Sequence, residues 1–306
     1  MKQIAFIFPG QGSQYAGMGK EFHDQFRVAR EIFEEADDTL RFSLSKLCFQ
    51  GPEEELKLTE NTQPAILTVS IAALRVLQSE KGIHPQFAAG HSLGEYSALV
   101  ASGALRFAEA VQTVRLRGKF MQEAVPVGEG AMAAILGMER DQVEKICEEV
   151  SSGEVVTPAN FNCPGQIAIA GHAKAVERAI EKVKQEGKKA ILLPVSAPFH
   201  SPLMKPAGER LEKALDGVSV GDLKVPVVTN VEAEVNISKD RVKPLLVAQV
   251  SSPVRWEESM RRMVKEGVEQ VLEIGPGKVL SGLMKRIDPK IEAKNIESIE
   301  TLKKIS

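Results

Sequence analysis

The sequence has few of the residues that mark several common classes of protein. Only three of its 306 residues are cysteines, Cys48, Cys147 and Cys163, and they lie far apart. An odd number of distant cysteines forms neither a disulfide framework nor a C-x-x-C metal pair, so we expect reduced, partly buried thiols. The histidines fall into no H-E-x-x-H motif and no His/Cys cluster. No metal site is therefore expected.

Strong charge and long hydrophobic runs are also lacking. The net charge is −2, and there is no basic run of the kind that binds nucleic acid or anionic lipid. The apolar stretch in the N-terminal MKQIAFIFPG is five residues long, too short for a signal-peptide core or a membrane span. These absences predict a cytoplasmic protein that binds neither nucleic acid nor membrane. With 43% hydrophobic and 26% charged residues, the chain can bury a full globular core.

Segments typical of strands and helices alternate over the first part of the chain. Residues 3–8, QIAFIF, are typical of a buried strand and lead into a glycine-rich turn. A second short strand, PQFAAG, ends at Gly90, and the helix after it stops near Gly103. Longer helices are predicted at 64–82 and 106–125 from the spacing of their apolar residues. This alternation favours a mostly parallel sheet with helices on its faces.

The middle of the chain follows a different rhythm. Between residues 126 and 197, segments typical of strands and helices occur in the order β-α-β-β-α-β, which is the ferredoxin-like split unit. We therefore predict a small ferredoxin-like domain at 126–197. It is inserted into a large, discontinuous α/β-hydrolase-like domain made of residues 1–125 and 198–306. Strands are predicted in the second part of this large domain at 225–231 and 268–277, with a helix between them.

The stretch GHSLG at 90–94 fits the G-x-S-x-G pattern of a nucleophile elbow. In that motif a serine lies on a strained turn between a strand and a helix, and the flanking glycines let the turn pack tightly. Ser92 has this context, which favours a nucleophile over an ordinary serine in a bend. The backbone N–H of the next residue, Leu93, would then point at the oxyanion of a tetrahedral intermediate.

A serine hydroxyl needs a base within hydrogen-bond reach before it can act as a nucleophile. His200 is the best candidate, because it lies in the proline-stiffened segment SAPFHSPLM, where the chain returns to the large domain. His91 adjoins Ser92, but neighbouring side chains at such a turn point apart, so we expect it to pack beside the site. An ordinary hydrolase triad would have an acid between Ser92 and His200 in the chain, but no acid in that interval ends a strand of the main sheet. This weakens the interpretation of the site as a hydrolase triad. A backbone carbonyl could orient the base instead.

Arg117 falls close to the apolar stripe of the helix predicted at 106–125. An arginine on a buried face needs a negative partner. Either an internal carboxylate pairs with it, or a ligand carboxylate binds its guanidinium group through two parallel hydrogen bonds. A third interpretation buries only the aliphatic part of the side chain. The residue pattern alone leaves all three open.

Eight stretches of the sequence together resemble one family, the malonyl-CoA:acyl carrier protein transacylases. They are FPGQGSQYAGMG, TQPAIL, GHSLGEYSAL, RLRGKFMQEA, NCPGQIAIAG, PFHSPLM, QVSSPVRW and EIGPGKVLSGL, spread over nearly the whole chain. The resemblance implies transfer of a malonyl group from malonyl-CoA to the pantetheine thiol of acyl carrier protein, for fatty acid biosynthesis. It implies ping-pong steps through a malonyl-serine intermediate. No cofactor is implied beyond these two substrates, and we expect a monomer whose partner is acyl carrier protein.

The resemblance also implies roles for residues at the reacting centre. Ser92 would accept the acyl group, and His200 would be its general base. The backbone N–H groups of Gln11 and Leu93 would form the oxyanion hole. The backbone carbonyl of Gln249 would orient His200, which accounts for the missing acid.

A second set of residues would bind the substrate. The resemblance places the malonyl carboxylate on Arg117, and it places Asn160 and Asn162 where the small domain lines the site. Phe199 resembles the bulky neighbour of malonyl-preferring relatives, so it either crowds an α-methyl group on the acyl chain or is a plain core residue. His91, next to the serine, is included as a supporting residue of the same pocket.

Three other functions share part of this pattern. A trans-acting acyltransferase of a polyketide synthase would share every residue named above. A serine thioesterase or esterase would share the serine and the histidine, but Arg117 and the missing acid argue against it. A catalytically silent module that docks carrier protein has no physical need for Ser92, His200, Gln11 and Arg117 together. The sequence therefore favours malonyl transfer over hydrolysis or docking alone, and it leaves the fatty acid and polyketide pathways open.

Overall fold

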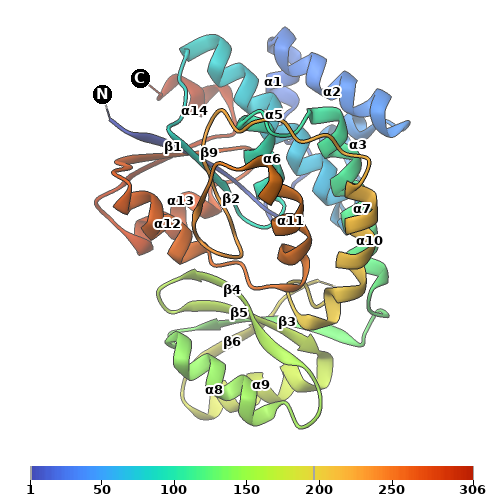
Figure 1. Ribbon diagram of the computed structural model, residues 1–306, viewed down its shortest axis with the longest axis vertical. Helices are drawn as coiled ribbons and strands as arrows, with labels where there is room; N and C mark the ends of the chain where they lie inside the picture. Colours follow the sequence, from blue (N-terminus) through green and yellow to red (C-terminus); the bar gives the residue numbers. More distant parts are fainter. Residues whose placement is uncertain (1, 196, 306) are drawn as a thin grey trace.

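The computed structural model describes residues 2–195 and 197–305, and it contains two separate β-sheets (Figure 1). Sheet A has six strands in the order β10-β9-β1-β2-β7-β8, and every neighbouring pair is parallel except β7 and β8. Its strands are β1 (Ile4–Phe8), β2 (Phe87–Gly90), β7 (Val227–Val228), β8 (Val235–Asn236), β9 (Gln270–Ile274) and β10 (Glu292–Ile296). The predicted mostly parallel sheet is confirmed.

Both faces of sheet A are buried, because successive side chains of β1 point into two different hydrophobic clusters. Phe6 and Phe8 belong to the larger cluster, and Ala5 and Ile7 belong to the smaller. The larger includes residues of α1 (Lys20–Gln25), α2 (Arg27–Leu40), α3 (Leu44–Gln50), α4 (Glu53–Lys57), α5 (Thr59–Lys81), α6 (Gly94–Ala101), α7 (Phe107–Glu123), η1 (Pro202–Met204), α10 (Lys205–Leu215), α11 (Val242–Ser251) and α14 (Ile299–Lys303). The smaller includes residues of α12 (Trp256–Lys265) and α13 (Val279–Ile287). A short 3-10 helix, η2 (Lys239–Arg241), precedes α11.

Sheet B is antiparallel and has its own core. The chain runs through β3 (Gly130–Leu136), α8 (Arg140–Val150), β4 (Val156–Cys163), β5 (Gln166–His172), α9 (Ala173–Gln185) and β6 (Lys189–Leu192). The strands lie in the order β4-β5-β3-β6. Both helices lie on the side of this sheet that faces away from sheet A, in the lower part of the view (Figure 1). The β-α-β-β-α-β element order predicted from the sequence is therefore present.

Sheet B is tied to the rest of the molecule through β4. Asn160 forms an isolated parallel bridge with Val254, the residue that precedes α12 by two positions. The backbone N–H of Phe161 donates to the Val254 carbonyl at 2.9 Å, and the Val254 N–H donates to the Ala159 carbonyl at 2.9 Å. These bonds fix one edge of sheet B beside the carboxyl ends of the sheet A strands.

Some element predictions were wrong in extent. The strand predicted at 225–231 is only two residues long, because Pro226 has no N–H to donate and the chain turns sharply after Val228. In that turn the N–H of Ala233 donates to the carbonyl of Thr229 at 3.0 Å. The last strand predicted in the 126–197 segment, KKAILLPVSA at 188–197, spans only Lys189–Leu192, and residue 196 lies outside the described residues. The four short helices α1–α4 and the edge strand β10 were not predicted.

The cysteines fit the expectation of reduced, partly buried thiols. Cys48, Cys147 and Cys163 are free and buried. Burial raises the pKa of the Cys147 thiol to about 12, so the thiol stays protonated and unreactive. In the part of the chain that the structure describes, no helix is both long and apolar enough to cross a membrane.

Candidate active site

The predicted elbow is present between β2 and α6. Ser92 has a φ of 51°, a left-handed conformation that is unusual for a residue with a side chain. A Cβ atom on Gly90 would lie 1.8 Å from the carbonyl carbon of Gly94, and one on Gly94 would lie 2.1 Å from the carbonyl oxygen of Phe8. No side chain fits at either position, so both glycines of the motif are required by the close approach of β1, β2 and α6.

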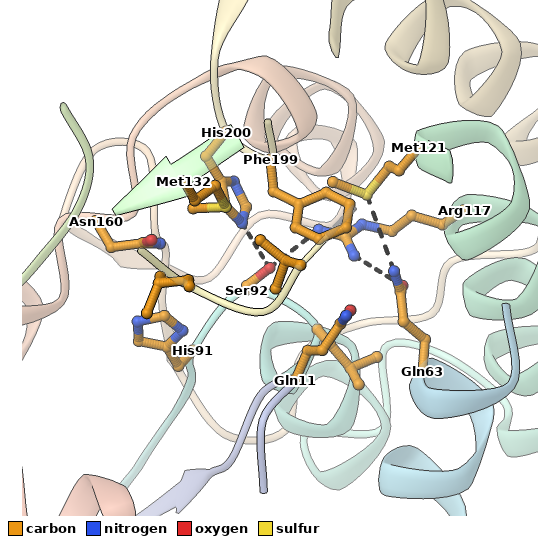
Figure 2. A pocket seen from close by; sticks show the side chains of 13 residues that line it. Gln11, Gln63, His91, Ser92, Arg117, Met121, Met132, Asn160, Phe199 and His200 are labelled. Carbon is orange, nitrogen blue, oxygen red and sulfur yellow. Dashed lines mark hydrogen bonds between the residues drawn. The ribbon is translucent and has the colours of Figure 1, made fainter. Parts of the chain in front are cut away.

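His200 lies against the serine. Its Nε2 is 2.7 Å from Ser92 Oγ, and its Nδ1 is 2.9 Å from the backbone carbonyl oxygen of Gln249 on α11 (Figure 2). A carbonyl oxygen only accepts, so Nδ1 carries the hydrogen and Nε2 is left to accept the proton of the serine hydroxyl. This is the contact with Gln249 that the resemblance implies. It supplies the orientation that an acid provides in a hydrolase triad.

His200 is held in its neutral form. The side chain is 3% exposed, and burial lowers its pKa to about 3, with the positive charge of Arg117 adding to the effect. The ring is therefore uncharged at neutral pH, which is the form that can take a proton from Ser92.

Arg117 on α7 is 1% exposed and points at the serine (Figure 2). Its Nη1 donates to Gln63 Oε1 at 2.7 Å, and its Nη2 donates to Gln249 Oε1 at 2.9 Å and to Ser92 Oγ at 3.2 Å. No carboxylate among the described residues forms a hydrogen bond or ion pair with the guanidinium group. Of the three interpretations open at the sequence level, burial of the aliphatic part alone is therefore wrong, and so is a direct internal ion pair.

Behind the serine lies a polar network that sequence reasoning missed. Glu95, in the first turn of α6, is 2% exposed, and its Oε2 accepts from Gln249 Nε2 at 2.7 Å and from the backbone N–H of Asn230 at 3.1 Å. Asn230 Oδ1 in turn accepts from the Ser92 N–H at 2.7 Å. A signal for Glu95 was available, because α6 is apolar on nearly every side and an acid inside such a helix must be buried. Gln63 and Asn230 carry no comparable signal.

The cavity in front of Ser92 has two walls, to which we give fixed names. The elbow wall comes from the sheet A side of the molecule and comprises Gln11, Gln63, Ser92, Leu93, Arg117 and Met121. The sheet B wall comprises Met132, Asn160, Leu193 and Val195. Phe199 and His200, from the segment that returns from sheet B, lie between the two walls, and His91 lies beside the serine. Phe199 is 8% exposed, and its ring faces the cavity (Figure 2).

The two residues expected to form the oxyanion hole border this cavity next to the serine. Leu93 follows Ser92 directly and is buried, and Gln11 lies in the loop after β1. The Gln11 side chain donates to Thr59 Oγ1 at 3.3 Å, which turns it toward the start of α5. That its backbone N–H and that of Leu93 bind an oxyanion stays a prediction.

His91 and Asn160 line the cavity in front of Ser92, and Asn162 lies behind His91 in an adjoining cavity. His91 Nε2 is 2.9 Å from Asn162 Oδ1, and its ring packs on Trp256 with the ring centroids 5.5 Å apart. Burial lowers the pKa of His91, so this ring is also uncharged. Asn160 lines both the main cavity and an adjoining one near α13, whereas Asn162 lines only the adjoining cavity. Within the described residues, no cluster of three or more His, Cys, Asp and Glu side chains could hold a metal ion.

Comparisons with known proteins find similarity over nearly the whole chain. Residues 5–304 match the family model described as "Acyl transferase domain". The chain is 55% identical over 304 residues to a malonyl CoA-acyl carrier protein transacylase from Bacillus subtilis (strain 168), which covers 99% of this chain and 96% of the relative.

Two solved structures extend the similarity to the fold. The transacylase from Clostridium perfringens is 44% identical, with a TM-score of 0.95 over 99% of this chain and 95% of that chain. A malonyl-transacylase in complex with its type II PKS acyl-carrier protein is 47% identical, with a TM-score of 0.96 over 98% of this chain and 97% of that chain. The two-sheet α/β architecture is thus that of known acyltransferases, and this chain belongs to the malonyl CoA-acyl carrier protein transacylase family.

Proposed function

We propose that this enzyme transfers the malonyl group of malonyl-CoA to the pantetheine thiol of acyl carrier protein, supplying fatty acid biosynthesis. Arg117 is the observation that carries the proposal. Its buried guanidinium group lies 3.2 Å from the nucleophile and is held by the uncharged amides of Gln63 and Gln249. A buried cation without a carboxylate partner is costly unless a ligand supplies one. Malonyl-CoA carries that carboxylate at the far end of its acyl group.

The first half of the reaction uses the serine and the histidine. His200 Nε2 takes the proton of Ser92 Oγ as the oxygen attacks the thioester carbonyl. The carbonyl oxygen becomes an oxyanion, which we place on the backbone N–H groups of Gln11 and Leu93. Removing one such donor typically costs about 10²–10³ in rate. The intermediate then collapses, coenzyme A leaves as a thiol with the proton from His200, and a malonyl ester remains on Ser92.

The second half reverses these steps with a different thiol. His200 takes the proton from the pantetheine thiol of acyl carrier protein, and the thiolate attacks the ester carbonyl. Ser92 leaves with the proton, which gives ping-pong kinetics. Water must be kept from the ester meanwhile, and the buried apolar side chains of Met121 and Met132 on opposite walls serve that purpose.

Arg117 also links recognition of the acyl group to the strength of the base. With no acyl group bound, its Nη2 donates to Ser92 Oγ and its charge helps to hold the pKa of His200 down to about 3. A malonyl carboxylate on the guanidinium group competes for that donor and offsets the charge. The serine oxygen is then released and the pKa of His200 rises, which makes the ring a better base. An acetyl group brings neither change.

Phe199 is proposed to restrict the acyl group further. Its ring lines the cavity beside Ser92, where an α-methyl group would have to fit. One additional methyl group in a tight pocket costs about 1–3 kcal/mol. We therefore propose that methylmalonyl-CoA is a poorer substrate, and comparison of kcat/KM for the two thioesters tests this. Equal values would leave Phe199 as a core residue.

Two other activities would use some or all of the same site residues. A relative of this family binds a type II PKS carrier protein, so a trans-acting role with a polyketide synthase shares the chemistry and differs in the carrier protein. A serine thioesterase or esterase would need only Ser92 and His200. The buried Arg117 and the use of a carbonyl in place of an acid at His200 Nδ1 both favour transfer over hydrolysis.

The deciding experiment is the intact mass of the protein after brief mixing with malonyl-CoA, alongside Ser92→Ala. We expect a gain of one malonyl group on the wild type alone, which is discharged by phosphopantetheinylated acyl carrier protein. Release of coenzyme A with accumulation of free malonate, and no loading of the carrier, would identify a hydrolase. Neither mass gain nor release would identify a module that only docks the carrier.

The proposal includes the organisation and setting of the enzyme. We propose that residues 126–197 form a ferredoxin-like small domain and that 1–125 with 198–306 form an α/β-hydrolase-like large domain. The order β4-β5-β3-β6, with both helices on one face, supports the first part. We also propose a cytoplasmic monomer without a bound cofactor, and three free buried thiols suit a reducing compartment. The mass of the protein in solution by light scattering tests the monomer.

A further inference from the structure

Glu95 is a buried acid that the steps above do not use. It lies three positions after the nucleophile on α6, within the GHSLGE stretch, and is 2% exposed. The other deeply buried glutamate with a raised pKa, Glu273 on β9, is explained by its fold position, because it accepts the backbone N–H groups of Leu280 and Ser281 at the start of α13. Glu95 caps no helix. Its partners are Gln249 and Asn230, which both contact the reacting groups.

Two short chains of hydrogen bonds connect the Glu95 carboxylate to the catalytic machinery. Through Gln249 it reaches Arg117, because Nε2 of that amide donates to Glu95 at 2.7 Å and Oε1 accepts from the guanidinium group at 2.9 Å. Through Asn230 it reaches the elbow, because Glu95 accepts from the Asn230 backbone N–H at 3.1 Å. The side chain of Asn230 accepts from the Ser92 N–H at 2.7 Å and donates to the Gly90 carbonyl at 2.7 Å. Glu95 thus supports both Arg117, which we propose binds the substrate carboxylate, and Ser92, the proposed nucleophile.

The direction of the Gln249 amide depends on this acid. An amide presents an acceptor on one side and donors on the other. With the Glu95 carboxylate and the Ser92 carbonyl, 3.0 Å away, both accepting from Nε2, the oxygen must face Arg117. The reverse orientation would set an NH₂ group against the guanidinium group and an oxygen against a carboxylate, and both contacts are repulsive. An ionised Glu95 holds the amide in the only orientation that suits Arg117.

We propose that Glu95, in its ionised form, is a positioning residue that fixes the Gln249 amide, and through it Arg117 and the serine turn, for malonyl transfer. This rests on the proposed function. The negative charge acts across one intervening amide, so it partly balances Arg117 without occupying the guanidinium edge that the substrate carboxylate needs. A carboxylate in direct contact with Arg117 would compete with malonyl for the same donors.

The charged and titratable groups around Glu95 decide the pH at which this arrangement holds. They are the Arg117 guanidinium group from α7, the Tyr96 hydroxyl from its own helix, and the His200 ring across Gln249. Burial raises the pKa of Glu95 to about 7, and its hydrogen bonds and the charge of Arg117 limit the rise. The pKa of His200 is about 3 and that of Tyr96 is raised above its usual range. Between pH 5.5 and 8.5, Glu95 is therefore the group among these that titrates.

The test is the pH dependence of kcat/KM for malonyl-CoA, which reports on the free enzyme. We expect the wild-type value to fall about thirtyfold from pH 8 to pH 5.5, as for one group of pKa about 7 that must be ionised. In Glu95→Gln, kcat/KM at pH 8 should be about 10²-fold lower than in the wild type. The fall in kcat/KM toward low pH, which we call the acid limb, should be absent in this variant. Glu95→Asp, which keeps the charge at a shorter reach, should lose kcat but keep the limb.

A matched control separates positioning from packing. Glu273→Gln makes the same change at an equally buried site outside the active centre, and it should keep the wild-type limb and most of the rate. A wild type that transfers malonyl with a flat profile, a Glu95→Gln variant that keeps the limb, or a Glu95→Asp variant with full kcat would each overturn the role of Glu95 alone. A wild type that transfers no malonyl group would overturn the proposed function itself, and this role with it.

Discussion

The two walls of the cavity are built on different principles. On the elbow wall, Ser92, Arg117 and Gln63 are polar and bonded to one another or to buried partners behind them. Apart from Asn160, the sheet B wall is apolar and presents Met132, Leu193 and Val195, whose side chains form no such network. A polar network requires fixed geometry at every atom, whereas an apolar wall requires only shape and exclusion of water. The comparison teaches that the elbow wall fixes the positions of the polar groups, whereas the sheet B wall sets the shape of the cavity and excludes water.

The elbow wall is also the strained side of the site. Ser92 on this wall has a positive φ angle of 51°, and His200, which lies between the two walls and contacts it, has one of 59°. The Ser92 N–H donates to Asn230 Oδ1, and His200 Nδ1 donates to the Gln249 carbonyl. Such conformations cost of order 1–3 kcal/mol each and persist only where the surroundings enforce them. At Ser92 the close contacts of Gly90 and Gly94 with neighbouring backbone provide that enforcement.

The largest effect is expected where the elbow wall loses its only unbalanced charge. In Arg117→Ala, kcat/KM for malonyl-CoA should fall about 10³-fold, which is about 4 kcal/mol, because the substrate carboxylate would then be buried without a partner. The value for acetyl-CoA should not fall, because removal of Arg117 frees the serine oxygen and removes the charge that lowers the pKa of His200. The preference for malonyl should therefore collapse. Steady-state kinetics with both thioesters measure this. An unchanged malonyl to acetyl ratio would mean that the carboxylate binds elsewhere.

Glu95→Gln, behind the elbow wall, should raise the stability of the protein at pH 8 although it lowers the activity. The pKa of Glu95 is raised from its ordinary value of 4.5 to about 7. Protonation of Glu95 in the folded protein therefore adds to the free energy of unfolding. This contribution is present at pH 4.5 and is lost as pH rises through 7. That loss amounts to about 3 kcal/mol. Glutamine is always neutral, so the variant should be more stable than the wild type at pH 8 by up to this amount and similar to it at pH 5.

Urea denaturation of both proteins at the two pH values measures this difference directly. Titration of His200 and of surface groups is common to both proteins and cancels in the comparison. A variant that is less stable than the wild type at pH 8 would mean that the ionised acid is a net stabilising group. The expected result, gained stability with lost activity, is the usual trade-off at a functional site.

The candidate catalytic residues could be located from the sequence more readily than the residues that hold them in place. Ser92, His200 and Arg117 occur in motifs or on an amphipathic pattern whose chemistry can be inferred locally. Gln63 and Asn230 are distant in sequence and act through side-chain amides, and no periodicity marks an amide that will face an arginine. The carbonyl of Gln249 is a backbone group, available at every residue, so only the resemblance could single it out.

The fold shows the same division. The alternation of strands and helices and the β-α-β-β-α-β order of sheet B follow from hydrophobic periodicity, which is a local property. Strand lengths did not follow, because the two-residue β7 is limited by Pro226 and by a turn that closes onto β8. Helices α1, α3 and α4 have only five to seven residues, too few to show a helical period. Helix α2 has fourteen residues and buries Ala29, Ile32, Phe33 and Ala36 on one face, so its pattern was present in the sequence and was missed.

A smaller effect is expected between the two walls, at Phe199. Replacement by leucine leaves the position apolar and removes ring atoms next to the acyl group. The ratio of kcat/KM for methylmalonyl-CoA to that for malonyl-CoA should rise about tenfold, the value of one methyl group in a tight pocket. Competition between the two thioesters in one reaction, with the loaded carrier protein analysed by mass, gives this ratio directly. A constant ratio would assign Phe199 to core packing.

The smallest effect is expected on the sheet B wall. Met132 is 4% exposed and lines the cavity from β3, opposite Ser92. Met132→Leu conserves volume and apolar character, so it should cost less than about 1.5 kcal/mol in stability and change kcat/KM for malonyl-CoA only a few-fold. The matched change on the elbow wall, Gln63→Leu, is of similar size but removes an acceptor from Arg117 Nη1 and leaves a buried donor unpaired. It should reduce malonyl transfer far more than Met132→Leu does. Equal losses in the two variants would show that shape governs both walls and that the polar network holds no special place in the reaction.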